Sequence, residues 1–442
     1  MSKPSSNAAQ AAITAIWHIE AAKIIGRVAR IVRDVGLAEE FAQDALVSAL
    51  ERWPTDGVPE NPGAWLMTAA KRRALDHLRH EEVTAGKAGE FGCELDFQHE
   101  LTHDTLIDKI DASLDAWFDK ANQATIDDDL LRLVFTACHP VLSPEARCAL
   151  TLRVMGGLST DEIARAYLKS EATIAQRIVR AKRTLAVARV PFEVPRGWEL
   201  EQRLASVLEV IYLIFNEGYS ATSGDDWMRP TLCEEALRLG RVLAGLMPEE
   251  SEVLGLVALM EIQSSRFSAR VSPSGEPILL LDQNRARWDH LLIRRGLDAL
   301  ARAEARPVAL GPYALQAAIA ACHARAQSVE QTDWGRIAAL YDALAQTAPS
   351  PVITLNRAVA VAMAFGPLAG LEVIDTLRDE PSLSNYHLLP SVRGDLLVRL
   401  DRFGEARTEF ERAAKLTRNA RERVLLLDRA MRCCKESIGP AK

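Results

Sequence analysis

Apolar and polar residues recur along most of the chain with the period of a helix. In residues 38–53, for example, Phe41, Ala45 and Ala49 fall on one face, which predicts an amphipathic helix. We expect Pro54, which follows directly, to end this helix because proline cannot continue the backbone hydrogen-bond pattern.

The rest of the pattern is also helical. A loop rich in Pro and Gly, residues 55–63, leads into a second helix over residues 64–79. Strand character is limited to residues 277–281, a stretch too short and isolated to imply a sheet. After Val190, amphipathic helices follow one another with short connections. The pattern therefore predicts an all-α fold.

Charge divides the chain into segments. The net charge is −1 over residues 1–82, −9 over 83–129, +6 over 130–190 and −3 over 191–442. We expect two small helical domains at 10–82 and 130–190, an acidic linker between them and a large helical extension after them. Part of the linker is expected to be helical, because apolar residues repeat at Leu106, Ile110, Leu114 and Trp117.

Composition narrows the class of protein. The 442 residues are 48% hydrophobic with a net charge of −7, which indicates folded domains rather than disorder. An acidic chain with evenly spread charge binds nucleic acid poorly. The segment with a net charge of +6 is nevertheless suited to bind it. Met1–Gln10 does not resemble a secretory signal, and the longest apolar run is too short to span a membrane. We expect a cytoplasmic protein.

Catalytic and metal-binding patterns are weak. The seven cysteines are scattered and lack a Cys-x-x-Cys pair, which favours buried reduced thiols. The pairs Cys138-His139 and Cys322-His323 lack the further ligands of a tetrahedral zinc site. In the extension, the spacing of the plausible catalytic carboxylates implies no reaction: Glu217, Asp225, Asp226 and Asp282. We therefore expect no cofactor, no metal and no enzyme activity.

The strongest functional signal lies in residues 158–183. Ser159 and Glu162 form a capping box, which predicts a short helix to about Tyr167. Ser170 is placed to cap a second helix. The two helices share a small set of apolar residues, namely Ile163, Ala164, Ile174 and Ile178. This spacing is that of a helix-turn-helix.

A helix-turn-helix places the start of its second helix against base edges and other basic residues against phosphates. We expect Thr173 and Gln176 to contact bases. The candidates for phosphate contacts are Arg177, Arg180, Lys182 and Arg183. The spacing alone leaves one alternative open, a basic helix on a solvated face that binds no DNA.

Residues 12–188 resemble the extracytoplasmic-function sigma factors of bacterial RNA polymerase. Ala-Glu-Glu-Phe-Ala-Gln-Asp at 38–44 is similar to the Ala-Glu-Asp-x-x-Gln-Asp helix of that family. Trp-Leu-x-x-x-Ala-Lys-Arg-Arg-Ala-x-Asp-x-x-Arg at 65–79 is similar to its Trp-Leu-x-x-x-Ala-Arg-Asn-x-x-x-Asp-x-x-Arg stretch. The linker and the helix-turn-helix follow in the order of the family.

The resemblance implies partners and roles. It implies binding to core RNA polymerase, with its β and β′ subunits, through Glu39, Glu40, Gln43 and Asp44 on the helix that docks on the β′ clamp. It implies contact with the melted minus-ten element, including a flipped base caught by the loop 55–61. The residues involved would be Asp56, Asn61, Trp65, Lys71, Arg72, Arg73, Asp76 and Arg79. A solvated helix face and a plain connecting loop remain alternatives from the residues alone.

The resemblance also implies that the helix-turn-helix reads the minus-thirty-five element. The linker would thread the RNA channel of the polymerase, although its composition suits a solvated spacer equally well. Three residues depart from the family pattern. Leu168 stands where Gly is frequent, so a left-handed turn there would carry strain. Ala175 replaces a commonly basic residue, and Arg72 stands where Asn is frequent.

The extension resembles that of the sigma-factor subgroup with a tetratricopeptide-like C-terminal domain. Cys138-His-Pro140 and residues 282–289 look like characteristic stretches of that subgroup. Small and apolar residues that would let paired helices pack closely also recur after 36 positions. They are Ala358, Val361, Gly370, Ile374 and Leu377, followed by Gly394, Leu397, Ala406, Phe410 and Ala413. An ordinary helical bundle remains an alternative.

We therefore expect a sigma factor that recognises and opens promoter DNA and is controlled by its own extension, which would bind a regulatory protein or ligand. Two other classes remain open. One is a helix-turn-helix regulator with a helical sensor domain, which leaves Gln43 and Asp44 unexplained. The other is a helical scaffold whose basic helix is incidental, and it predicts no salt-sensitive affinity for DNA.

Overall fold

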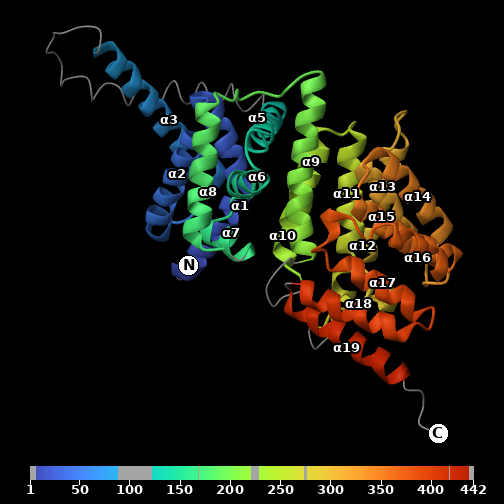
Figure 1. Cartoon of the computed structure of the whole chain (residues 1–442). Coiled ribbons are helices and arrows are strands. Elements are labelled where there is room, and N and C mark those ends of the chain that lie inside the picture. Colours follow the sequence, from blue (N-terminus) through green and yellow to red (C-terminus); the bar gives the residue numbers. More distant parts are fainter. Residues whose placement is uncertain are drawn as a thin grey trace. The chain divides into compact units, whose positions relative to one another are not determined.

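The computed structural model describes residues 6–87, 122–167, 169–220, 228–272, 276–417 and 419–437. These residues form helices and no β-strand (Figure 1), which confirms the all-α fold. The strand-like stretch 277–281 forms only an isolated antiparallel bridge, between Val271 and Pro277, and part of a 3-10 turn. The chain divides into two compact units, residues 1–210 and 211–442, which we describe separately.

Helix α1 (Ser6–Val32) is the packing centre of the first unit. It contacts α2 (Val35–Asp56), α3 (Pro62–Lys87), α5 (Asn122–Ala137) and α6 (Pro144–Val154). Its fully buried residues are Ile13, Ala21, Ile24, Ile25, Val28 and Ala29, and burial of each large one contributes roughly 1.5–3 kcal/mol. The unit also contains α7 (Thr160–Ala166), α8 (Glu171–Val187) and the first half of α9 (Trp198–Tyr219). Helices of both predicted small domains thus pack on α1.

Helix α2 does not end at Pro54, so that prediction was wrong. The helix continues to Asp56, and the N–H of Gly57 donates to the carbonyl of Trp53 at 3.0 Å. Gly57 has a φ of 90°, which glycine adopts without strain. A proline in the last turn removes only one backbone hydrogen bond, and the helix tolerates that loss.

The predicted linker is helical at both ends. Helix α3 continues past residue 82 to Lys87, and α5 begins at Asn122. The predicted helical repeat at Leu106, Ile110, Leu114 and Trp117 lies outside the described residues. The acidic residues of 122–129 therefore belong to the first turns of α5.

The second unit is a stack of helical hairpins. Consecutive helices contact one another from α10 to α19, which gives the tetratricopeptide-like architecture predicted for the extension. After the second half of α9, the helices are α10 (Pro230–Leu246), α11 (Ser251–Ser264), α12 (His290–Glu304), α13 (Pro312–Arg325), α14 (Trp334–Thr347), α15 (Pro351–Phe365), α16 (Pro367–Asp375), α17 (Leu388–Val398), α18 (Phe403–Leu416) and α19 (Ala420–Ser437).

Small residues set the distance between paired helices in this unit. A Cβ on Gly370 of α16 would lie 2.4 Å from the Cβ of Ala362 and 2.7 Å from the carbonyl oxygen of Ala358, both on α15. A Cβ on Gly394 of α17 would lie 2.8 Å from the ring of Phe410 on α18. The two units of the 36-residue repeat are therefore the helical pairs α15–α16 and α17–α18.

Candidate nucleic-acid and polymerase interface

Helices α7 and α8 have the local structure expected of the helix-turn-helix. The N–H of Ser159 donates to the Glu162 carboxylate at 2.7 Å, and the N–H of Glu162 donates to the Ser159 hydroxyl at 3.1 Å. Ser170 caps α8 by accepting from the N–H of Thr173 at 3.2 Å. The four predicted apolar contact residues are buried. Leu168, in the turn, lies outside the described residues.

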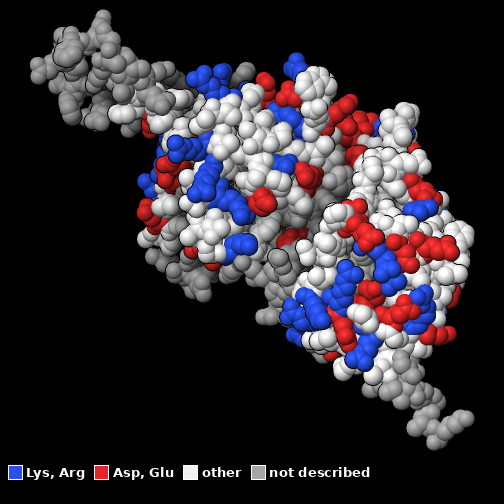
Figure 2. Space-filling view, viewed as in Figure 1, with Lys and Arg blue, Asp and Glu red and all other residues white. Residues whose placement is uncertain are grey.

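Most of the predicted DNA-binding residues of α8 lie on its outer face. Arg177 is half-buried. The other four are exposed, namely Thr173, Gln176, Arg180 and Arg183. Figure 2 shows Lys and Arg side chains gathered on the face of the first unit where Figure 1 draws α8. Lys182 is different, because its side chain is only 22% exposed. The outer face of α8 thus has the acidic Glu171 at its start, the uncharged Thr173 and Gln176 after it, and basic side chains further along.

Lys182 is held by Glu39, one of the predicted polymerase-binding residues. Glu39 is only 4% exposed and pairs with Lys182 of α8. Its other oxygen accepts from the Nε of Arg153, on α6, at 2.8 Å. Two cations therefore surround one buried carboxylate, which offsets its desolvation. This cluster joins the two predicted sigma domains and leaves Glu39 inaccessible to a partner in this arrangement.

Asp129 forms a second charged contact between α1 and α5. It is 2% exposed and lies 3.2 Å from Arg27, 3.8 Å from Arg30 and 3.4 Å from Arg132. Burial raises the pKa of its carboxyl group, and hydrogen bonding and charge from the three arginines oppose that rise. The last acidic residue of the predicted linker is therefore part of the domain core and not of a solvated spacer.

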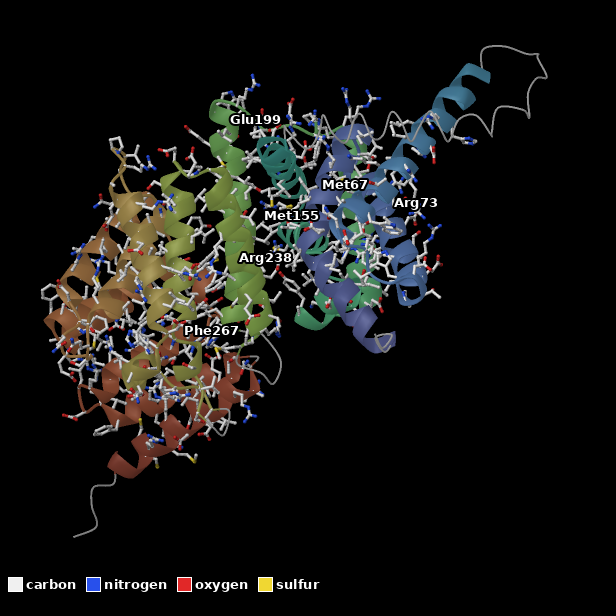
Figure 3. The ribbon with its side chains drawn as sticks, turned by 180° about the vertical axis from the view of Figure 1, so that it is seen from behind. Met67, Arg73, Met155, Glu199, Arg238 and Phe267 are labelled. Atoms are coloured by element: carbon white, nitrogen blue, oxygen red, sulfur yellow. The ribbon has the colours of Figure 1, made fainter. Side chains whose placement is uncertain are left out.

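The remaining predicted polymerase-binding residues are accessible. Glu40 and Asp44 are exposed and Gln43 is half-buried on α2. Arg73 of α3 (Figure 3) donates to the Ser48 hydroxyl at 2.9 Å and lies 3.6 Å from the Asp44 carboxylate. The predicted polymerase surface and the predicted minus-ten surface therefore adjoin one another.

The other predicted minus-ten residues lie along α3 and just before it. Arg72, Asp76 and Arg79 are exposed, Lys71 is half-buried, and Arg79 lies 3.4 Å from Asp76. Trp65 packs edge-on against Trp53 with ring centroids 5.4 Å apart. The Asn61 side chain accepts from the N–H of Ala64 at 3.1 Å and so caps α3. Asp56 is exposed on the last turn of α2 and not in the loop where it was predicted.

A buried polar network, which no sequence pattern predicted, joins α9 to the helices before the helix-turn-helix. Arg203 donates to the carbonyl of Phe135 at 2.8 Å, and the Ser206 hydroxyl donates to the carbonyl of Cys138 at 2.5 Å. Arg147 of α6 donates to Ser206, and all three polar side chains are buried. Arg203 and Ser206 stand three residues apart among apolar residues of α9, a spacing that places them on the face that packs.

The network gives a structural reason for the Cys138-His139-Pro140 stretch. The carbonyl of Cys138 receives the Ser206 hydroxyl, and its thiol lies 3.3 Å from the hydroxyl of Thr151. Burial raises the pKa of this thiol to about 11. Burial, and then the charge of Arg203, lowers the pKa of His139. The Cys138-His139-Pro140 stretch therefore lies just after α5, at the point where α9 packs against it.

The described residues carry no metal cluster, disulfide or membrane-spanning helix. They contain no group of three His, Cys, Asp or Glu side chains arranged to hold a metal ion. Their six cysteines are free, and five of these are buried, while Cys93 lies outside the described residues. None of the described helices is both long and apolar enough to cross a membrane.

Comparison with known proteins identifies the first unit. A family model of sigma-70 region 2 matches residues 20–83, and one of sigma-70 region 4 matches residues 132–185. The chain is 29% identical over 167 residues to "ECF RNA polymerase sigma factor SigK" of Mycobacterium ulcerans (strain Agy99), a match that covers 37% of this chain and 78% of SigK. The chain belongs to the extracytoplasmic-function sigma factors. Its α1–α3 match region 2 and α5–α8 match region 4.

The match to "Probable ECF RNA polymerase sigma factor SigI" of Mycobacterium tuberculosis (strain ATCC 25618 / H37Rv) is 27% identical over 178 residues, 40% of this chain and 56% of SigI. The extension has its own relatives. Residues 203–304 match a family of unknown function, DUF6596, and this match begins at Arg203 in α9.

Two further comparisons cover most of the sigma factor. "Uncharacterized protein R00370" of Rhizobium meliloti (strain 1021) is 42% identical over 400 residues, 90% of each chain. This match is long enough to include most of the helical extension, so the extension is not specific to this chain. The crystal structure of yeast Tom70 covers 95% of this chain and 83% of its own at 12% identity, with a TM-score of 0.36, too low to support any argument.

Proposed function

We propose that this sigma factor, acting in the cytoplasm, docks on the β and β′ subunits of core RNA polymerase through the exposed face of α2. In this proposal Glu40, Gln43 and Asp44 make the polymerase contacts. Basic residues of α3 hold the melted minus-ten element, and the outer face of α8 reads the minus-thirty-five element. The role of the sigma factor is to direct polymerase and not to catalyse a reaction itself.

The observation that carries the promoter assignment is the composition of the outer face of α8. Thr173 and Gln176 are exposed near the start of the helix, where base edges would be met. Arg180 and Arg183 are exposed further along, at a spacing suited to phosphates. A solvated helix without a ligand does not account for this order of uncharged and basic residues.

Run-off transcription with reconstituted polymerase on a promoter library tests this assignment. We expect Arg180→Ala/Arg183→Ala to weaken promoter binding and lower the salt dependence of log K by about two, because two phosphate contacts are lost. The matched control is Arg196→Ala, an exposed arginine outside α8 and α2. Asp44→Ala should weaken the complex with core polymerase. Promoter DNA binding by a chain that forms no complex with core polymerase would support a helix-turn-helix regulator instead.

We further propose that the extension controls this activity and receives the regulatory protein or ligand. The support is the docking of α9 on region 4, because α9 is the first helix of the extension. Arg203 and Ser206 reach the backbone at the end of α5, directly before α6 and the helix-turn-helix. A change in α9 would therefore alter the surroundings of the DNA-reading module.

The test of this control compares Arg203→Ala with Gln202→Ala. Arg203 is buried, whereas Gln202 is an exposed neighbour on the same helix. We expect Arg203→Ala to change promoter-directed transcription at least several-fold, and Gln202→Ala to leave it unchanged. Deletion of residues 211–442, which leaves the first compact unit, should also change activity. Unchanged activity and inducibility in both the Arg203 variant and the deletion would contradict the proposal.

A further inference from the structure

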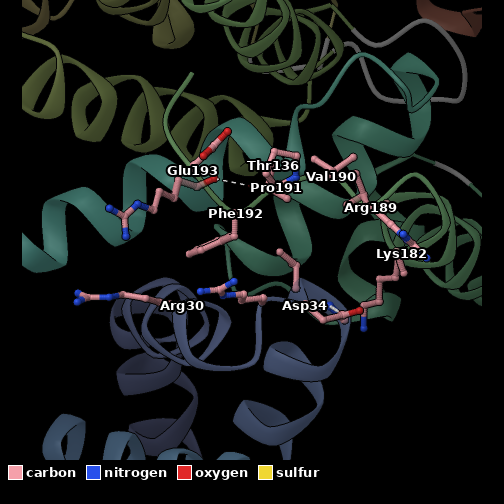
Figure 4. A pocket seen from close by; sticks show the side chains of 15 residues that line it. Arg30, Asp34, Thr136, Lys182, Arg189, Val190, Pro191, Phe192 and Glu193 are labelled. Atoms are coloured by element: carbon pink, nitrogen blue, oxygen red, sulfur yellow. Dashed lines mark hydrogen bonds between the residues drawn. The ribbon is translucent and has the colours of Figure 1, made fainter. Parts of the chain in front are cut away.

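Region 2 and region 4 enclose a cleft that no part of the proposed sigma function uses. The cleft has a volume of about 700 Å³, within the range of small-molecule sites, roughly 300–1,000 Å³. Its walls are the junction of α1 and α2, one side of α5, and the end of α8 with the chain that follows it. Figure 4 shows Phe192 in the cleft, with Arg30 and Asp34 on the α1–α2 side and Lys182 and Arg189 near the end of α8.

The lining of the cleft is strongly basic. It contains five basic side chains, Arg30, Arg33, Arg132, Lys182 and Arg189, and two acidic ones, Asp34 and Glu193. Asp34 is already engaged, because its carboxylate accepts from the N–H groups of Gly36 and Leu37 at 2.6 and 3.0 Å. Three of the basic side chains are paired with carboxylates next to the lining, Lys182 with Glu39 and both Arg30 and Arg132 with Asp129. The positive charge that is left without a carboxylate partner among the described residues is that of the other two arginines.

Two of these arginines stand out. Arg33 follows α1 and Arg189 follows α8, so one comes from region 2 and the other from region 4. Both are exposed, and neither forms an ion pair within the described part of the chain. Their φ angles are 54° and 50°, a conformation at helix ends that glycine adopts more easily. Both positions thus carry a guanidinium despite a backbone that favours glycine.

We propose that this cleft binds a polyphosphate group, with Arg33 and Arg189 as its anion-binding residues. Guanidinium groups bind phosphate oxygens through paired hydrogen bonds, and both arginines line the same cleft. The apolar wall formed by Leu185, Val190 and Phe192 suits a nucleoside attached to the phosphates. The proposal concerns ligand binding and does not depend on the promoter roles proposed above.

Phosphates of promoter DNA fit this cleft poorly. The residues proposed to meet bases begin at Thr173, which lies about 21 Å along the axis of α8 from its last residue, Val187. The cleft is also a concave space between two domains, whereas the DNA-reading surface is the outer face of α8. A small polyanion that contacts both domains would stabilise their closed arrangement, in which Glu39 is buried.

Isothermal titration calorimetry of the full chain tests the proposal with sodium tripolyphosphate, ATP and AMP as probes. We expect saturable binding of tripolyphosphate and ATP, and binding of AMP at least tenfold weaker. Tighter binding of ATP than of tripolyphosphate would identify a nucleotide as the source of the phosphates, and equal binding would identify free polyphosphate. No saturable binding of either would overturn the proposal.

Substitutions locate the site. Arg33→Gly/Arg189→Gly should weaken tripolyphosphate binding at least tenfold without lowering the melting temperature, because glycine suits both φ angles. The control Arg52→Gln/Arg196→Gln removes two exposed arginines outside the cleft and should leave binding unchanged. Unchanged binding in the glycine variant, or equal loss in the control, would overturn the proposal. So would a loss of promoter-DNA affinity in the glycine variant as large as its loss of tripolyphosphate affinity.

Discussion

Arginines in the second unit pack against carbonyl oxygens, hydroxyls and aromatic rings, and Arg285 is a half-buried example. Arg285 donates to the carbonyls of His323 and Ala326 at 2.6 and 2.7 Å and to the Thr332 hydroxyl at 3.1 Å. Its guanidinium also lies 5.1 Å from the ring centroid of Trp288. A planar cation with five donors suits such a site better than lysine. Arg285 therefore holds the loop before α12 against the end of α13 and the segment before α14.

This arginine environment perturbs a neighbouring histidine. Burial, and then the charges of Arg266 and Arg285, lower the pKa of His323 from 6.5 to about 4. The folded protein thus favours neutral His323 more than the unfolded chain does. The contribution of neutral His323 to the free energy of unfolding is complete above pH 6.5. This contribution is lost as the pH falls towards 4, by about 1.4 kcal/mol per pH unit.

The prediction is tested with His323→Gln, which cannot titrate. The urea midpoint of the wild-type protein should fall more between pH 7 and pH 5 than that of the variant. His290→Gln is the matched control, because His290 is exposed, and it should follow the wild type. Parallel pH dependence of His323→Gln and the wild type would show that the burial of His323 has no such effect.

Close helix packing makes a second residue-scale prediction at Gly370. Gly370→Ala would place a Cβ 2.4 Å from that of Ala362, so α16 must move away from α15. We expect a loss of about 1–3 kcal/mol in the free energy of unfolding. Gly404→Ala is the control, because open space surrounds that position on α18, and it should be neutral or gain up to about 1 kcal/mol. Urea denaturation measures both, and equal effects would contradict the prediction.

At the scale of elements, the Glu39 cluster links α2 to α6 and α8. Arg153→Met removes one of the two cations from a buried carboxylate, and we expect a loss of about 3 kcal/mol, because Lys182 still compensates part of the charge. If polymerase binding requires the two sigma domains to separate, the same variant should bind core polymerase several-fold more tightly.

Fluorescence anisotropy with labelled sigma factor measures this affinity. Arg196→Met is the control, since Arg196 is exposed and lies outside both α2 and the cluster. A variant that is destabilised but binds polymerase with unchanged affinity would show that the Glu39 cluster stabilises the fold without restraining partner binding.

Elements fixed by neighbouring residues were predictable from the sequence, and contacts between distant segments were not. The capping box and the Ser170 cap involve residues three apart, and both are present as predicted. The Glu39 cluster joins residues 114 and 143 positions apart, and no local pattern indicates such pairing. The family resemblance implied that Glu39 contacts polymerase, although Glu39 is buried and its helix packs against α8.

Local rules also failed at Pro54 and were incomplete at Arg203. A proline does not stop a helix that has only one turn left, so α2 ended two residues later than predicted. Arg203 would be expected on the surface, because arginine is mostly exposed, but it is buried against a carbonyl at the end of α5. The candidate DNA surface was accessible to sequence reasoning because it is a single helix, whereas the docking of α9 depends on tertiary structure.

At the scale of the whole molecule, charge is distributed unevenly between functional parts. The net charge of −7 hides a segment at +6 that contains region 4. Some of its basic residues lie on the exposed face of α8 and others line the cleft beside it, whereas Arg147 and Arg153 are bound within the unit. Whole-chain pI therefore says little about which ligands this sigma factor binds.

The division into two compact units predicts two unfolding transitions in calorimetry, one for residues 1–210 and one for residues 211–442. Because the units have separate cores, a variant in one should shift only its own transition. Arg153→Met should lower the first and Gly370→Ala the second, each by roughly 2–4 °C per kcal/mol lost for units of this size. Tripolyphosphate should raise only the first transition, since the cleft lies within residues 30–193. A single transition shifted by both variants would instead mean that α9, which runs from one unit into the other, couples them into one cooperative structure.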